Sequence, residues 1–384
     1  MLHVSSSRKR PLQNNIEDLR EEGNVKMAKV SRLEKKLTLC LAEGDFYEAH
    51  QIYRTLYYRM ADQHKYSELL ELLYEGASKF IELNQPASGT DLAELYIEAL
   101  QKSNTPVSSP VLNQIESLFA KIPAELASEI STSGQKVDRR TKFLNNALKW
   151  SMDVSKKKEH RTRGHPDLHQ RIAGVLWHEH NYEQSRNHFL LSDDGETFAS
   201  FLIDFHLQCG LRGEVDLFVT QAVLQILCRK KTKTASACFF HYAEKHPGIQ
   251  GEPPYKLPLL NFIWLLLMCL EVKKVTHFST LVEQYQPSIR RDPTYTSYLD
   301  KIGQLYFGLP PPRQESQPMG GMFANLLKGL MGDTKKEAVE SDSGESSDTG
   351  DNDTICSDGY ETPSSEAAAP SAASSALLND DELD

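Results

Sequence analysis

A short pattern typical of the turn between two packed helices constrains the fold most. It reads Gly44-Asp45-Phe46-Tyr47-Glu48-Ala49 and returns in looser form as His180-Asn181-Tyr182-Glu183-Gln184-Ser185. Asp45 and Asn181 can each cap the second helix of a pair, because the side-chain oxygen accepts a backbone N–H that otherwise has no partner. The pattern therefore predicts helix pairs at two distant places in the chain.

The residues that follow each cap suit close packing between neighbouring helices. Ala49 and Ser185 are small, and an aromatic residue follows four positions later, at Tyr53 and Phe189. The two copies are separated by about four of the roughly 34-residue periods of tetratricopeptide-like repeats. The helices expected between them do not repeat the signature. The pattern thus favours a stack of similar helix pairs without a strict period.

Proline and glycine residues divide the chain from Lys26 to Gly308 into segments of helical length. Apolar residues such as Leu69, Leu73 and Phe80 follow the spacing of one helix face. The pattern of alternating strands joined by hairpin turns is missing, and the proline-rich connector 246–258 fits either an extended loop or a small hairpin. Helices are expected over Leu33–Leu41, Phe46–Gln63, Tyr66–Leu83, Gly89–Lys102, Ser109–Lys121, Val137–Met152, Asp167–His180, Tyr182–Leu191, Glu196–Cys209, Glu214–Lys230, Ala235–Lys245, Leu259–Lys273, His277–Tyr285 and Thr294–Phe307.

The 384-residue chain has a net charge of −10, and this charge is concentrated at one end. Residues 333–384 hold fifteen Asp and Glu residues and two Lys, whereas the remainder is nearly balanced. A balanced body gives no electrostatic reason to expect a nucleic-acid-binding protein. A segment rich in serine and acidic residues cannot bury enough apolar surface to fold, so we expect a disordered tail.

The helical body is expected to end at the proline linker 310–312. Beyond it, Phe323, Leu326 and Leu330 share one side of a short amphipathic helix over Met322–Met331. A helix this short is marginal alone, so it must dock on the body or on a partner. The expected divisions are a disordered N-terminus (1–24), two halves of the helical body (25–153 and 154–308), the linker with its short helix (309–332) and the acidic tail (333–384).

Motifs of catalytic and phosphate-binding sites do not occur in the sequence. Phosphate loops, dinucleotide-binding loops, nucleophile elbows and zinc-protease helices each need glycine or histidine at fixed spacings that the chain lacks. His165 and His169 have the i, i+4 spacing that can share a metal ion, but no further ligands complete a tetrahedral set. Solvated or core-edge histidines are therefore favoured, and we expect no enzyme activity, no cofactor and no metal.

The cysteines and the apolar runs indicate a cytosolic protein. Six cysteines occur without a C-x-x-C motif, and five lie in apolar helical stretches, which is typical of buried thiols. The most apolar run, Leu257–Leu270, is shorter than the roughly 20 residues that span a membrane. The N-terminus lacks the apolar core of a secretory signal. Direct membrane insertion is not expected.

Two charged segments each allow two interpretations. The basic stretch 156–163 reads as a loop between helices, either simply solvated or facing an acidic partner. It lacks the interleaved aromatic residues that nucleic-acid contact favours. In the tail, Asp342–Ser347 fits D-S-G-x-x-S, a phosphorylation-dependent degradation motif with Ser343 and Ser347 as phosphosites. In so serine-rich a tail the same string also arises by chance.

An ordered series of longer strings resembles the Get-four family, the scaffold subunit of the pathway that targets tail-anchored membrane proteins, and is nearer to its animal members than to its fungal ones. The resemblance covers about residues 25–332. The strings are Gly44–His50 with Tyr53–Leu56, Gly164–His169, Trp177 with Asn181-Tyr182, Glu214–Val219, Leu259–Trp264, Glu283–Pro287, Arg290–Pro293 and Ile302–Gly308.

The resemblance implies an all-α fold, a right-handed superhelical α-solenoid of stacked antiparallel helix pairs with no catalysis of its own. It also implies that the N-terminal half docks the tail-anchor targeting ATPase. The C-terminal half is expected to hold a large BAG-family holdase, which carries a ubiquitin-like adaptor subunit. The family thereby hands tail-anchored proteins over for insertion into the ER membrane and takes part in triage of mislocalised membrane proteins. The acidic tail and the lysine-rich stretch 156–163 depart from the family pattern.

Candidate contact residues follow from charge and apolar character at the two ends. On the ATPase side, basic residues of the first helices form the candidate set, with ordinary solvated helix faces as the alternative: Lys35, Lys36, Arg54 and Arg59. On the holdase and adaptor side, the set combines the start of an apolar helix with the short amphipathic helix: Phe262, Trp264, Phe323, Leu326 and Leu330.

Two other classes of binding protein stay open. A tetratricopeptide-like adaptor for short peptides would need a cluster of inward Lys and Asn residues on repeated helices, which the sequence does not assemble. A helical-repeat RNA binder would use the stretch 156–163, and salt-dependent retention of RNA would identify it.

Overall fold

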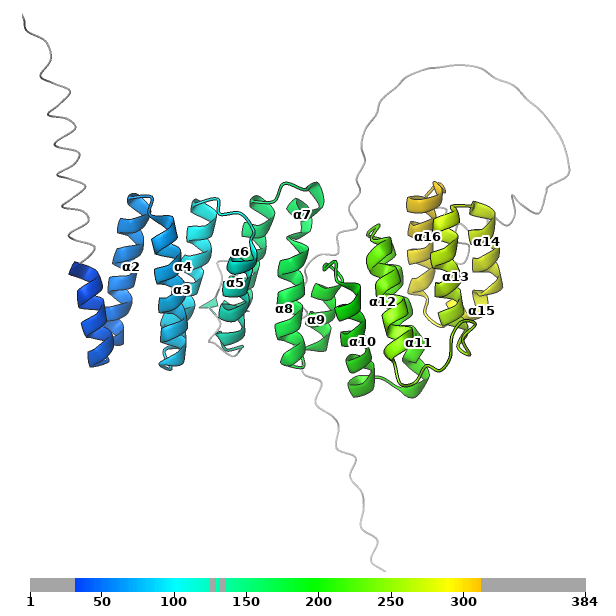
Figure 1. Ribbon diagram of the computed structural model, residues 1–384, viewed down its shortest axis with the longest axis horizontal. Coiled ribbons are helices and arrows are strands. Elements are labelled where there is room, and N and C mark those ends of the chain that lie inside the picture. The colour runs from blue at the N-terminus through cyan, green and yellow to red at the C-terminus, as the bar shows by residue number, and fades with distance from the viewer. Residues whose placement is uncertain (1–31, 125–128, 131–135, 312–384) are drawn as a thin grey trace, which may run out of the picture. The chain divides into compact units, whose positions relative to one another are not determined.

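Antiparallel helices stand side by side in chain order in the computed structural model, which describes residues 32–124, 129–130 and 136–311 (Figure 1). An unlabelled helix covers 32–43. The labelled helices are α2 Phe46–Asp62, α3 Tyr66–Glu82, α4 Pro86–Lys102, α5 Ser109–Lys121, α6 Arg139–Asp153, α7 Lys158–Arg163, α8 Pro166–His178, α9 Tyr182–Phe189, α10 Gly195–Cys209, α11 Val215–Leu227, α12 Thr232–Lys245, α13 Pro258–Val272, α14 Val275–Gln284, α15 Gln286–Ile289 and α16 Thr294–Phe307, with a 3-10 turn η1 at Arg212–Glu214.

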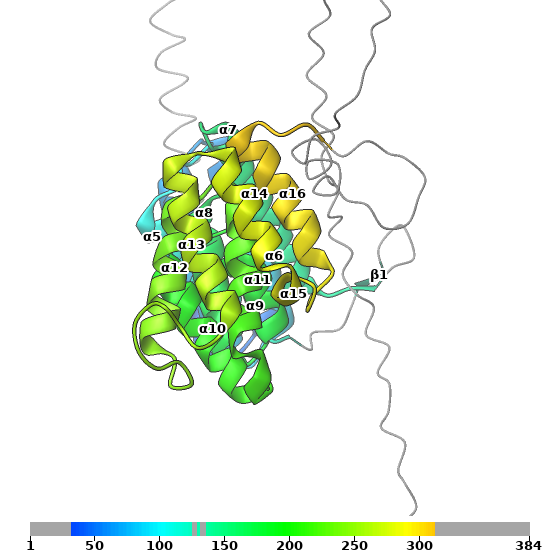
Figure 2. The same ribbon diagram turned by 90° about the vertical axis from the view of Figure 1, so that its right-hand side faces the viewer.

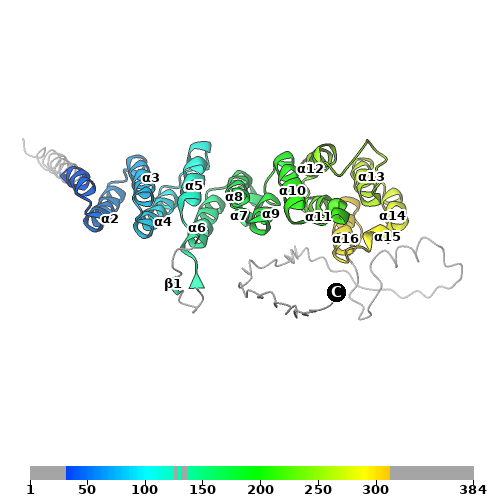
Figure 3. The ribbon, with the colours of Figure 1, turned by 90° about the horizontal axis from the view of Figure 1, so that it is seen from below.

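The helices form two rows, which confirms the predicted all-α solenoid of stacked pairs. Seen from below, α3, α5, α10 and α12 lie in one row, and α4, α6, α9 and α11 lie in the other (Figure 3). The longer helices thereby bury their apolar stripes against their neighbours. In α3, Leu69, Leu73, Ala77 and Phe80 are all fully buried.

Both predicted helix caps are confirmed. The Asp45 side chain accepts a hydrogen bond from the backbone N–H of Glu48 at 3.0 Å. Asn181 accepts one from the backbone N–H of Gln184 at 3.4 Å. Both small residues, Ala49 and Ser185, are fully buried, as the pattern requires.

The aromatic residues of the pattern fill the next layer. Tyr53 and Phe189 are buried, and the Tyr53 ring packs edge-on against Phe80 with centroids 5.7 Å apart. The same ring explains Gly76, because a Cβ at that position would lie 2.5 Å from the Tyr53 ring.

Removing the first cap gives a modest, measurable loss of stability. Asp45→Ala is expected to lower the free energy of unfolding by about 1 kcal/mol, because one N–H at the start of α2 loses its partner. Chemical denaturation measures this loss. Asp153→Ala, at the C-terminal end of α6, removes an exposed carboxylate that caps nothing and is the matched control. Equal destabilisation by both variants would contradict the capping role.

Buried side chains form two hydrophobic clusters that meet in α8. The first runs from Leu37 to Leu176 and the second from Ala173 to Ile302. The predicted boundary between residues 153 and 154 precedes this junction by about one helix.

The structure differs from the sequence-based expectation in four short elements. The stretch 156–163, predicted as a loop, contains helix α7, in which no residue is buried. A helix without an apolar stripe gives no periodic signal. Val137, expected in a helix, lies in a two-residue strand, β2 (Lys136–Val137), which pairs antiparallel with β1 (Glu129–Ile130). The four-residue helix α15 is likewise too short to show a period.

The connector between α12 and α13 contains turns and bends but no strand in the described residues 246–257. It is therefore the extended loop of the two sequence-based alternatives. Figure 2 shows it projecting beside α12 and α13. Asn261 ties it to α13, because its side chain accepts from the Tyr255 N–H at 2.6 Å and donates to the Tyr255 carbonyl at 2.7 Å.

Candidate partner-binding surfaces

Of the four basic candidates on the first helices, two form ion pairs within the chain and two take part in none among the described residues. Lys35 and Arg59 are exposed. Lys36 pairs with Glu48, and Arg54 donates to both oxygens of Asp91 at 2.9 Å. Arg54 therefore joins α2 to α4 and is only partly available to a partner.

Asp91 is the centre of this ion-pair cluster. Its carboxylate also contacts His50 Nε2 at 2.8 Å. Although burial opposes ionisation, the hydrogen bond from His50 and the charge of Arg54 hold the pKa of the Asp91 carboxyl below its usual range. Replacing Arg54 would leave a half-buried carboxylate without its main counter-charge, so this position mixes structural and binding effects.

The outward face of α2 also carries two aromatic residues that the sequence analysis missed. Tyr47 is 78% exposed and Tyr58 is 60% exposed, and their spacing from Arg54 places all three on one side of α2. Exposed Tyr beside Arg is a composition typical of protein-binding hot spots. The signal was present in the sequence, because these positions lie opposite the buried stripe of Ala49, Ile52 and Leu56.

At the other end, the structure corrects the assignment of Phe262. Its side chain is fully buried, and its ring lies 5.7 Å from that of Tyr285. Phe262 therefore supports the core of α13 and is withdrawn as a contact residue. Trp264 is half-buried and stays a candidate.

Three apolar residues on α12 and α13 are more exposed than Phe262 and Trp264, the two aromatic residues proposed on α13. Phe240 is 47% exposed, Met268 is 49% exposed and Val272 is 53% exposed. Met268 and Val272 follow Trp264 at four-residue intervals on α13, so the three share one helix face. Helical periodicity places these residues on a face but does not say which face a second row of helices covers.

The remaining candidates lie outside the described residues: Phe323, Leu326, Leu330, Ser343 and Ser347. Their roles stay predictions.

Two of the histidines form a buried pair rather than a metal site. His169 Nδ1 and His188 Nδ1 are 2.8 Å apart, and His169 Nε2 lies 2.8 Å from the Arg163 carbonyl. The carbonyl requires a proton on His169 Nε2, so His169 Nδ1 accepts from His188 Nδ1–H. In the described part of the chain, no group of three or more His, Cys, Asp or Glu residues could hold a metal ion.

The cysteines agree only partly with the expectation of buried thiols. Cys40 and Cys238 are buried and Cys228 and Cys269 are half-buried, but Cys209 at the end of α10 is exposed. The apolar stretch around Cys209 does not determine which side faces the neighbouring helices. No described helix is long and apolar enough to cross a lipid bilayer.

Comparison with known proteins agrees with this architecture. Residues 63–327 match the family model of Golgi to ER traffic protein 4. The Golgi to ER traffic protein 4 homolog of Oryzias latipes is 48% identical over 303 residues, which cover 79% of this chain and 88% of the relative. The homolog of Homo sapiens is 45% identical over 311 residues, 81% of this chain and 90% of the relative.

The fold is also similar to a solved structure. The crystal structure of C. therm. Get4 superposes with a TM-score of 0.64 at 20% sequence identity, and the match covers 81% of this chain and all of the other. The helical stack, the two confirmed caps and the family match over most of the body lead to one conclusion. This chain belongs to the Golgi to ER traffic protein 4 family.

Proposed function

We propose that the chain is a non-enzymatic cytosolic scaffold that hands tail-anchored membrane proteins to their targeting ATPase for insertion into the ER membrane. Membership of a family named for Golgi-to-ER traffic is the observation that carries this proposal. A stack of helices suits the task, because it offers separate surfaces at a fixed separation and makes transfer between two bound partners effectively intramolecular.

The proposal assigns the ATPase to the outward face of α2 and its neighbouring basic residues. Tyr47 and Tyr58 are exposed on that face, Arg59 is exposed near the C-terminal end of α2, and Lys35 is exposed on the preceding helix 32–43. The holdase with its ubiquitin-like adaptor is assigned to α12 and α13, around Trp264, Met268 and Val272. The same complex would also perform triage of mislocalised membrane proteins. Mass spectrometry of natively co-purifying proteins tests the whole assignment, and absence of the ATPase and the holdase would overturn it.

A charge reversal on the α2 face separates the two partners. Arg59→Glu combined with Lys35→Glu is expected to weaken ATPase binding by about tenfold to a hundredfold, because two exposed attractive charges become repulsive. Holdase binding should be unchanged. Both affinities are measured by surface plasmon resonance with the full chain.

The matched control moves the same charge change to another exposed surface. Lys79→Glu combined with Lys245→Glu should leave ATPase binding within twofold, since both lysines are exposed and lie outside the α2 face. ATPase binding that is equal for the two double variants would remove the assignment of the α2 face.

A further inference from the structure

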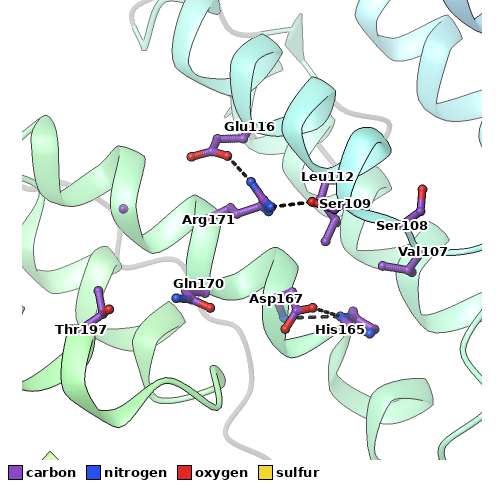
Figure 4. A pocket seen from close by; sticks show the side chains of 11 residues that line it. Val107, Ser108, Ser109, Leu112, Glu116, His165, Asp167, Gln170, Arg171 and Thr197 are labelled. Atoms are coloured by element: carbon purple, nitrogen blue, oxygen red, sulfur yellow. Dashed lines mark hydrogen bonds and ion pairs between the residues drawn. The ribbon is translucent and has the colours of Figure 1, made fainter.

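A polar groove lies between α5, α8 and α10, away from both surfaces assigned above. Its volume is about 730 Å³, within the range of ordinary ligand sites. Arg171 of α8 crosses it, donating to Glu116 at 2.7 Å and to Ser109 at 3.3 Å, both on α5 (Figure 4). Thr197 of α10 lines the opposite side. A defined contact between α5 and α8 therefore spans the groove.

The backbone supplies hydrogen-bond donors to the groove, whose lining also holds the carboxylates of Glu116 and Asp167. Helices α5, α8 and α10 all begin beside it, at Ser109, Pro166 and Gly195. The N-terminal N–H groups of each helix carry partial positive charge. Ser108, at the start of α5, makes no side-chain cap, so the first N–H groups of α5 remain available to an acceptor in the groove.

Helix α7 and the two lysines before it supply positive charge at the rim of the groove. The stretch 156–163 holds five Lys or Arg residues and one Glu. Lys156, Lys157, Lys158 and Arg163 are exposed, and none takes part in an ion pair within the described chain. The His160 ring of α7 meets the His165 ring at the groove edge, with centroids 4.8 Å apart. The cationic segment and the groove are thus continuous.

The structure assigns to this combined surface an acidic segment of a partner polypeptide. The groove offers hydrogen-bond donors and acceptors to an extended peptide backbone, and the α7 lysines offer charges to its carboxylates. Among the described residues, the exposed large apolar and aromatic side chains belong neither to α7 nor to the groove lining. Single-stranded nucleic acid would stack its bases on aromatic rings, and a membrane surface would receive inserted apolar side chains. Carboxylates on a peptide need neither.

This surface is a third contact, independent of the ATPase and holdase assignments, so its failure would leave the proposed function intact. The probe is a fluorescein-labelled peptide of about ten residues with alternating Glu and Ala, titrated with the full chain by fluorescence anisotropy. Binding is expected, and it should weaken as salt is raised because the exposed charges are screened.

Two variants test the two parts of the surface. The triple reversal Lys156→Glu, Lys157→Glu and Lys158→Glu is expected to weaken peptide binding at least about tenfold. Gly174 lines the groove, and a Cβ at this position would have no atom within 4 Å, so Gly174→Leu directs its new side chain into open space. It should weaken binding about fivefold without any change of charge, by occupying the groove.

The control carries the same charge change elsewhere. Lys79→Glu, Lys245→Glu and Lys256→Glu replace three exposed lysines outside α7 and the groove. This triple variant should retain binding within about twofold, and circular dichroism should show all variants folded. If both triple variants lost the same peptide affinity, the loss would follow from the net charge of the chain alone, and the proposed site would be wrong. Tighter binding of a poly-uridine oligomer of equal charge, or of phosphatidylserine vesicles, would overturn the choice of an acidic peptide.

Discussion

Lowering the pH from 7 to 5 is expected to destabilise the folded chain by several kcal/mol through its buried histidines. Burial lowers the pKa of His169 to about 4 and, together with the neighbouring charge of His169, that of His188 to about 3. Burial and the neighbouring charge of His206 lower the pKa of His246 to about 4. All three side chains are at most 4% exposed.

The buried histidines form two pairs, His169 with His188 and His206 with His246. The hydrogen bonds of both pairs require neutral rings. His206 Nε2 lies 2.9 Å from the Leu211 carbonyl and must donate to it, so His206 Nδ1 accepts from His246 Nε2–H at 3.0 Å. His246 Nδ1 in turn accepts from the Gly248 N–H at 2.9 Å. A second proton on either ring of a pair would set two donors against each other or leave a buried charge.

The direction of the pH effect follows from proton linkage. Each folded pKa lies below the value of about 6.5 expected in the unfolded chain, so below pH 6.5 the unfolded state binds more protons. Stability is complete above that pH and falls as the pH drops toward 4. At pH 5, each of the three histidines lowers the free energy of unfolding by about 2 kcal/mol.

Urea denaturation at pH 7, 6 and 5 measures this loss, and a matched pair of variants assigns it. His188→Asn keeps an N–H donor for His169 but removes one titrating ring, so about 2 kcal/mol less stability should be lost between pH 7 and 5. His178→Asn removes an exposed histidine and should leave the pH dependence as it is. If both variants lost the same free energy of unfolding between pH 7 and 5, the buried pair would not be responsible for the destabilisation at low pH.

Gly195→Ala is expected to destabilise the chain by about 3 kcal/mol, although alanine is the better helix former. A Cβ at Gly195 would lie 2.3 Å from the Thr234 carbonyl oxygen and 2.9 Å from the Cys238 nitrogen. Both are backbone atoms of α12, so neither can rotate away. Helix α10 would have to separate from α12 and give up buried contacts on both sides.

The control for this substitution is another helical glycine. Gly174→Ala in α8 meets no atom within 4 Å, and it should stabilise the chain by about 0.5 to 1 kcal/mol because alanine loses less backbone entropy. The midpoint of chemical denaturation measures both variants. A Gly195→Ala variant as stable as the unmodified chain would show that α10 and α12 tolerate a wider separation.

The sequence by itself determined the longer helices and the caps at which two of them begin. Caps such as Asp45 and buried stripes such as Leu69, Leu73 and Phe80 depend on residues within a few turns of one another, so local spacing is sufficient to predict them. The short elements α7, α15, β1 and β2 were missed because they carry too few residues for a period.

The tertiary structure alone decided which side chains are available to partners. Arg54 donates to Asp91, which lies 37 residues away in the sequence, and Arg171 donates to Glu116, which lies 55 residues away. Both arginines are therefore only partly available to a partner. Phe262 is buried although Met268, on the same apolar helix, is half exposed. Local spacing fixes only the angle of a residue around its helix axis. Exposure depends on which neighbouring helix covers that angle, and only the packed stack of helices supplies that information.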